Sequence, residues 1–255
     1  MNNYNQQEFS DYTVVDSHQV SGTGVVAKKF MASVFLWMFV ALGVSTVFSV
    51  LYASTPSLLR ELYAMNEAGQ LRPTMLFWVV TFAPFAFLLI MQFGMARLSS
   101  GTLTLLFLAF AAVLGISLSN ILLVYTAGSV VSCFGAAAAM FGVMAVMGYT
   151  TEKDLTSFGR LLTMGLIGIV IASIINMFMH SSGMSYIISI VGVAVFTGLT
   201  AYDTQKLKRI GAGLEYEGTS ASDTKKLALM GALSLYLDFI NLFLMLLRLF
   251  GNRRD

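Results

Sequence analysis

Residues 227–250 read LALMGALSLYLDFINLFLMLLRLF, the most informative run of the chain. It is long and apolar enough to cross a membrane as one helix, yet Asp238 lies near its middle. An aspartate at the centre of a membrane helix costs about 2.5 to 3.5 kcal/mol, and such residues generally face a bundle interior and mark a route for ions or protons. The stretch therefore predicts a membrane helix with an inward-facing side, and it favours transport over catalysis.

The small and polar residues of this helix share one face. They recur at spacings of three and four: Gly231, Ser234, Asp238, Asn241 and Met245. We expect this face to point into a bundle, and Leu235, Leu242 and Phe243 to point toward lipid or neighbouring helices.

The composition of the whole chain indicates an integral membrane protein. Of the 255 residues, 57% are hydrophobic and only 11% are charged, and the mean hydropathy is +0.78. A soluble core of this size cannot hide so much apolar surface. The formal net charge of +2 is too small to suggest nucleic acid binding. The single cysteine, Cys133, excludes an intrachain disulfide and favours a packing role.

The chain divides into a tail and a membrane domain. Residues 1–29 are polar and mixed in charge, so they predict a flexible cytoplasmic tail without a cleavable signal peptide. Residues 30–255 predict an all-α membrane domain with seven apolar spans, at about 30–52, 74–96, 101–123, 127–149, 159–179, 185–203 and 227–250.

Proline and glycine add detail to these spans. Pro56 to Pro73 predicts the first connector, and Pro84 should kink the second span. Small residues in the fourth and fifth spans are expected to let helix backbones approach closely: Gly135, Ala139, Gly142, Gly165 and Gly168.

The basic residues predict the orientation in the membrane. With a cytoplasmic N-terminus, ten of the 15 Lys and Arg residues fall on the cytoplasmic face: Lys28, Lys29, Arg97, Lys153, Arg160, Lys206, Lys208, Arg209, Lys225 and Lys226. The other five fall on the opposite face: Arg60, Arg72, Arg248, Arg253 and Arg254. Because positive charge is favoured inside, the N-terminus is expected in the cytoplasm and the C-terminus outside.

A second aspartate also adjoins an apolar run. Asp203 ends the charge-free stretch 161–202 and is followed by Lys206 and Lys208, which predicts a place near the cytoplasmic boundary. Asp238 is about eleven residues beyond Leu227, roughly 16 Å deeper at 1.5 Å per residue. The two can meet only if the sixth membrane helix continues past its apolar stretch or the seventh begins late.

Two interpretations of the aspartates stay open at this point. If Asp203 and Asp238 meet, like-charge repulsion favours one shared proton, and the pair titrates as a unit. Alternatively, Asp203 is a solvated residue paired with Lys206 or Lys208, and Asp238 only holds helices together. Arg97, at the end of the second span, is either a counter-charge for the aspartates or an ordinary topology signal.

Metal binding is not expected. His18 belongs to the tail and His180 to a hairpin tip, and no second histidine, cysteine or carboxylate lies at ligand spacing from either.

Four stretches carry a family resemblance: GISLSNILLVYT (115–126), MFGVMAVMGYTTEKDL (140–155), TAYDTQ (200–205) and GALSLYLDFINLF (231–243). Together they resemble the Bax inhibitor-1 (transmembrane Bax inhibitor motif) family in its bacterial YccA-like branch, and the resemblance covers nearly everything after residue 30. It implies seven membrane helices, six of them packed around a central C-terminal seventh. This chain differs from shorter members in a long connector, expected from Lys206 to Lys226.

The resemblance also implies a function. Bacterial members resemble pH-sensitive calcium leak channels of the plasma membrane, the bacterial inner membrane. In them, an aspartate pair on the last two helices senses pH and an arginine on the second helix latches onto it. These residues match Asp203, Asp238 and Arg97. The resemblance implies no cofactor, only calcium as the transported ion, bound transiently near the aspartates.

Two other functions compete with this one. An intramembrane aspartyl protease also uses two membrane aspartates, but it needs Gly-x-Gly-Asp where this chain reads Tyr236-Leu237-Asp238, so we do not expect an enzyme. YccA-like proteins also resemble modulators of the membrane protease FtsH that act by binding, and the polar tail 1–29 suits this role.

Overall fold

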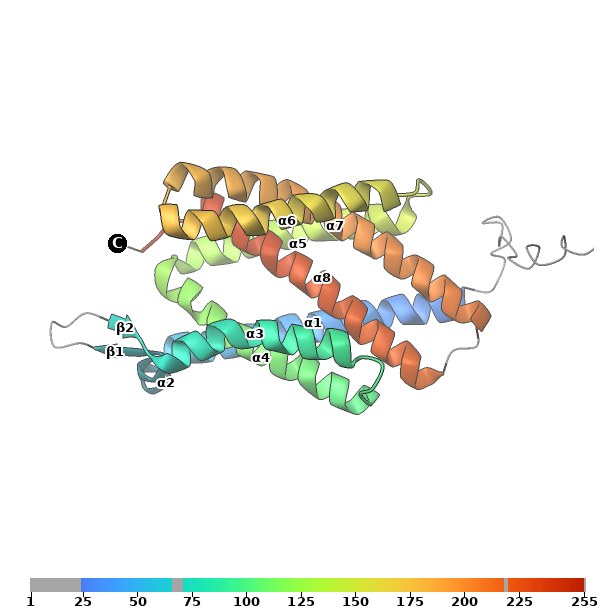
Figure 1. Ribbon diagram of the computed structural model, residues 1–255, viewed down its shortest axis with the longest axis horizontal. Coiled ribbons are helices and arrows are strands. Elements are labelled where there is room, and N and C mark those ends of the chain that lie inside the picture. The colour runs from blue at the N-terminus through green and yellow to red at the C-terminus, as the bar shows by residue number, and fades with distance from the viewer. Residues whose placement is uncertain (1–23, 66–70, 218–219, 255) are drawn as a thin grey trace, which may run out of the picture.

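A computed structural model describes residues 24–65, 71–217 and 220–254. These residues form eight helices and one short hairpin (Figure 1). The helices are α1 (Val25–Ser54), α2 (Pro56–Leu62), α3 (Met75–Gly94), α4 (Ser100–Val124), α5 (Ala127–Thr150), α6 (Thr156–Met179), α7 (Ser182–Glu217) and α8 (Ala221–Phe250), and the strands are β1 (Tyr63–Met65) and β2 (Leu71–Pro73). Seven of these helices, all except α2, are long and apolar enough to cross a membrane, which confirms the predicted fold class.

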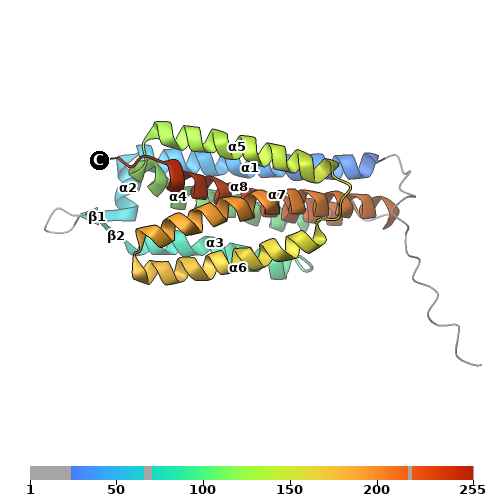
Figure 2. The ribbon, with the colours of Figure 1, turned by 90° about the horizontal axis from the view of Figure 1, so that it is seen from above.

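Helix α8 lies at the centre of the bundle. It crosses diagonally between the other membrane helices in Figure 1, and α1, α4, α5 and α7 pack against it. Figure 2 shows α1 and α5 along one edge of the bundle and α3 and α6 along the other. Leu235 and Leu242 of α8 are fully buried and Phe243 nearly so. These residues were expected to face either lipid or neighbouring helices, and the structure shows that they face neighbouring helices.

The prediction of a long connector between the last two membrane helices is wrong. Helix α7 continues past Asp203 to Glu217, and α8 begins at Ala221. Ser220 caps α8, because its hydroxyl accepts a hydrogen bond from the Asp223 backbone amide at 3.1 Å. Hydropathy marked only the apolar parts of both helices, whereas their polar extensions are also helical.

The first connector is more ordered than expected. Pro56 stands at the start of α2, where a missing amide costs nothing, and the β1–β2 hairpin follows. Thr74 then joins the hairpin to α3: its hydroxyl donates to the Glu61 carbonyl at 2.7 Å and accepts from the Phe77 amide at 3.4 Å. Helix α3 continues unbroken through Pro84.

The two ends of the bundle are distinct. Helix α1 begins at one end and α8 finishes at the other (Figure 1), as seven spans require. Helix α1 begins at Val25, so the last residues of the expected tail are helical, while residues 1–23 lie outside the described part of the chain. At the α8 end, the chain pairs with the α4–α5 turn: the Thr126 amide donates to the Asn252 carbonyl and the Arg254 amide to the Val124 carbonyl.

Three of the glycines that were expected to bring helices together do not. A Cβ built on Gly135, Gly142 or Gly168 meets no neighbouring atom within 4 Å. The close approaches occur at other glycines. A Cβ on Gly148 of α5 would overlap the backbone of Ala201 in α7. Spacing along one helix identifies a stripe of small residues, but it does not show whether another helix lies against that stripe.

Candidate functional site

Asp238 is enclosed in the centre of the bundle. It lies 17 residues beyond Ala221, about 26 Å along α8 at 1.5 Å per residue. This is deeper than expected from the sequence, which predicts a helix that begins at Leu227. Its side chain is buried, with 7% of the residue exposed. Among the described residues, its Oδ2 atom has no hydrogen-bond partner. A buried oxygen of this kind is costly unless a proton, a cation or water satisfies it.

Asp203 lies on the face of α7 that packs against α8. Its carboxylate accepts a hydrogen bond from the Ser234 hydroxyl, and Ser234 lies four residues, one helical turn, before Asp238. The two helices pack closely here, since a Cβ on Gly231 of α8 would overlap the side chain of Leu207 in α7. The structure thus brings the Asp203 carboxylate against Ser234, one helical turn from Asp238, across a single interface.

This contact depends on the unexpected length of α7. Had α7 ended at its apolar limit, Asp203 would be a terminal residue exposed to solvent. Instead it lies 14 residues before Glu217, inside a continuous helix, and is half-buried. Within the described residues, it forms no ion pair with Lys206 or Lys208. Lys208 instead donates to the Tyr149 carbonyl at 2.8 Å.

Two glycines hold α7 close to its other neighbours, and sequence reasoning missed both roles. Gly148 of α5 lies against the backbone of Ala201, and Gly159 of α6 lies against the ring of Tyr202. These contacts are at the two residues that precede Asp203. The backbone carrying the aspartate is therefore fixed from two sides. Gly148 was within a stretch that carried the family resemblance, but nothing in that stretch shows its partner.

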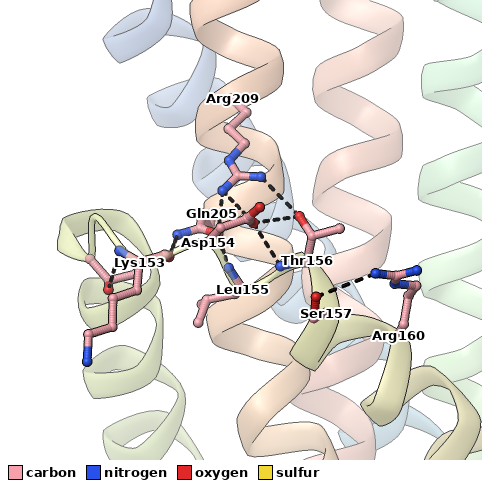
Figure 3. A network of polar contacts seen from close by, with 9 residues as sticks. Lys153, Asp154, Leu155, Thr156, Ser157, Arg160, Gln205 and Arg209 are labelled. Atoms are coloured by element: carbon pink, nitrogen blue, oxygen red, sulfur yellow. Dashed lines mark hydrogen bonds and ion pairs between the residues drawn. The ribbon is translucent and has the colours of Figure 1, made fainter. Parts of the chain in front are cut away.

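A buried glutamine anchors α7 two residues after the aspartate (Figure 3). Gln205 is 4% exposed and bridges the loop between α5 and α6. Its Nε2 donates to the Lys153 carbonyl at 2.7 Å, and its Oε1 accepts from the Leu155 amide at 2.9 Å. Both backbone groups lack a helical partner, so the glutamine satisfies them and fixes the loop on α7.

An ion pair extends the same network one turn further along α7. Arg209 Nη2 lies 2.7 Å from Asp154 Oδ1 and 3.1 Å from Gln205 Oε1 (Figure 3). Asp154 also accepts from the Thr156 hydroxyl at 2.6 Å and from the Thr156 amide at 2.9 Å. These hydrogen bonds, together with the Arg209 charge, hold the pKa of Asp154 below its ordinary value.

A second buried network lies on the other side of α8. Tyr236, two residues before Asp238, is fully buried, and its hydroxyl lies 2.7 Å from Ser45 Oγ of α1. Ser45 donates its own proton to the Ala111 carbonyl of α4 at 2.7 Å, so the tyrosine hydroxyl is the donor to Ser45. This chain of hydrogen bonds ties the central helix to α1 and α4.

The third predicted site residue, Arg97, and the histidines and cysteine that were not expected to form a site are placed as follows in the structure. Arg97 follows the end of α3 in an exposed turn, and no ion pair of its side chain is found among the described residues. His180 caps α6 in an exposed left-handed conformation, and His18 lies outside the described residues. Cys133 is buried in the core. Within residues 24–65, 71–217 and 220–254, no three His, Cys, Asp or Glu side chains could hold a metal ion together.

Comparison with known proteins places the chain in a family. The family model described as inhibitor of apoptosis-promoting Bax1 matches residues 27–255. The chain is 44% identical over 227 residues to the inner membrane protein YbhL of Escherichia coli (strain K12), covering 89% of this chain and 93% of that protein. It is 40% identical over 242 residues to an uncharacterized protein of Borreliella burgdorferi, covering 95% and 100%. With its seven membrane helices, the chain therefore belongs to the Bax inhibitor-1 family of multi-pass membrane proteins.

Proposed function

We propose that this protein is a pH-sensitive calcium leak channel in which Asp203 and Asp238 form the gate. One observation carries the proposal. Asp203 is bound by Ser234 one helical turn from Asp238, which is enclosed in the central helix with an unpartnered carboxylate oxygen. An intramembrane carboxylate in such a place is a functional residue by default.

Protonation would change which partners the pair prefers. With both carboxylates ionised, their mutual repulsion opposes the close packing of α7 on α8, and a cation or basic side chain is favoured between them. One added proton removes that repulsion and supplies a donor for an unpartnered oxygen. The equilibrium between two packings of the α7–α8 interface then depends on pH, which is the property a gate requires.

Calcium flux into proteoliposomes over a pH series tests the gate. Asp203→Asn keeps the shape and the Ser234 contact but removes one of the two titrating groups, so flux should become largely independent of pH. Asp223→Asn is the matched control, since Asp223 is exposed at the start of α8 and should leave the pH response unchanged. An unaltered pH profile in Asp203→Asn would show that the pair is not the sensor.

Arg97 is proposed as the latch of the closed state. It follows α3, which packs mainly on α4 and leaves most of its surface exposed, so a shift of α3 could carry the guanidinium toward the aspartates. A latch of about 1 to 3 kcal/mol holds the open population down by roughly five- to 150-fold. Arg97→Ala should therefore raise basal flux by a factor in this range. Arg72→Ala, in the hairpin at the opposite end, should not; equal leak in both variants would exclude the latch.

Modulation of a membrane protease such as FtsH by binding is the competing proposal, and it depends on the tail. Because α1 begins at Val25, a chain lacking residues 1–23 keeps every described helix. Under the channel proposal this shortened chain retains pH-dependent flux. A tail-dependent modulator would instead lose its effect on proteolysis while any flux persisted.

A further inference from the structure

An apolar cavity of about 510 Å³ opens between α1 and α5. These two helices run along the same edge of the bundle (Figure 2), and Phe239 of the central helix contributes to the lining. Met38 and Phe141 are buried deep in it, whereas Phe39 and Val146 on its rim are 63% and 62% exposed. The cavity is therefore a recess that faces the lipid and that the protein's own side chains do not fill.

One end of this recess is basic. Lys28 precedes Met31 and Phe35 by three and seven residues on α1, so it continues the face of α1 that lines the recess. On the other wall, Tyr149 lines the recess, and the Lys208 ammonium lies 5.2 Å from the centre of its ring.

The two lysines lie at the same end because α1 and α7 touch there. A Cβ on Gly211 of α7 would come within 3.0 to 3.4 Å of Phe30 and Ala27 of α1, so the turn that follows Lys208 packs on the turn that contains Lys28. Neither lysine forms an ion pair within the described residues. Asp154, in the adjoining loop, is already taken by Arg209.

We propose that this recess binds an anionic phospholipid, with an acyl chain in the apolar cavity and the phosphate between Lys28 and Lys208. The chemistry of the site matches an amphiphile: hydrocarbon-lined along its length and cationic at one end only. Basic pockets between membrane helices are suited to anionic headgroups. The recess gives an acyl chain more van der Waals contacts than a flat helix surface does, because a chain lying in it contacts protein on three sides.

A single tryptophan on the rim can report which lipid occupies the recess. The chain contains two tryptophans, so Phe39→Trp combined with Trp37→Phe and Trp78→Phe gives one reporter beside the cavity. Quenching by phosphatidylglycerol or phosphatidylcholine with brominated chains then gives the relative affinity of the two lipids at this position. A reporter at Phe178→Trp, exposed on α6, gives the reference for ordinary boundary lipid.

Phosphatidylglycerol should be preferred at position 39 and not at position 178. Lys28→Gln and Lys208→Gln should each lower the preference for phosphatidylglycerol about five-fold, because a basic side chain near an anionic lipid contributes about 1 kcal/mol. Arg160→Gln, an exposed charge at the start of α6, is the matched control and should have no effect. Equal preference at both reporters, or an equal loss in Arg160→Gln, would overturn the proposal in favour of boundary lipid and general surface charge.

Filling the cavity tests the acyl chain separately. Gly142 lines the recess, and its Cβ position is open, so Gly142→Leu should fold normally and still exclude the chain. The preference at position 39 should then be lost although both lysines remain. Gly135→Leu, two turns earlier on α5, occupies similar open space outside the recess and should retain it. Retention in Gly142→Leu would show that no chain enters the cavity.

Discussion

Helices α8 and α3 are both apolar enough to cross a membrane, yet they occupy opposite environments. Helix α8 is largely buried from Ala228 to Leu247 by four other helices, whereas only Pro84 and Met91 are buried in α3, which the structure describes throughout. Lipid tails solvate leucine as well as a neighbouring helix does, so hydropathy alone does not decide which helix lies at the centre. The small and polar residues of α8 do, because only protein neighbours can satisfy them.

The largest loss of stability is expected at Gly148 of α5, which lies against the backbone of α7, the partner of α8. Gly148→Leu forces α5 away from Ala201 and should destabilise the protein by about 3 kcal/mol or prevent folding, since overpacking without room to move is at the upper end of its usual cost. Unfolding by SDS titration measures the change. Gly168→Leu adds the same side chain at an open position of α6 and should cost little. Similar losses in both variants would mean that the α5–α7 contact is not tight.

A matched pair of leucines tests the comparison of α8 with α3 directly. Leu242→Ala in α8 leaves a cavity in the core and should cost about 2 kcal/mol, the lower part of the range for buried leucines, because the apolar transfer contribution is weak in lipid. Leu89 of α3 is 58% exposed, and Leu89→Ala should change stability by less than about 0.5 kcal/mol. The same titration measures both. If the two costs are equal, α3 is as firmly packed as the central helix.

The smallest effect concerns the contacts of Asp154, which help to hold the loop between α5 and α6 on α7. The pKa of Asp154 is below its ordinary value in the folded protein, so its stabilising contacts are fully present above that value, about 3.9, and weaken as pH falls below it. Hydrogen exchange at the Thr156 amide, corrected for its intrinsic pH dependence, should therefore be slow at pH 6 and faster near pH 3. Asp154→Ala, which removes the acceptor oxygen, should exchange quickly at both pH values. A Thr156 amide equally protected at pH 3 would contradict this account.

The spans and the central helix were predictable from particular residues. Each predicted span lies within a helix of the structure to within two residues, since polar connectors interrupt the apolar runs. Gly231, Ser234 and Asp238 marked the face of α8 that meets α7, because a carboxylate in a membrane needs a protein partner.

Most of the parts that were not predicted depend on long-range partners. Residues 206–217 are rich in charge, so they resembled a loop, although Leu207, Ile210 and Leu214 recur at the spacing of one helical face. Gln205 and Asp154 are 51 residues apart and give no sequence signal of meeting through Arg209. Gly142 and Gly148 are both glycines of α5, but only Gly148 has a backbone against it. The position of a glycine along one helix does not by itself show whether another helix lies against it.

Helix α8 is both the centre of the bundle and the last membrane helix to be synthesised. This helix is the last of the seven spans to leave the ribosome, so the other six enter the membrane before their common core exists. Until then Ser45 lacks the Tyr236 hydroxyl and Asp203 lacks Ser234. In the nascent six-helix form these polar groups therefore lack their partners inside the membrane. Insertion of α8 supplies the partners and completes the packing.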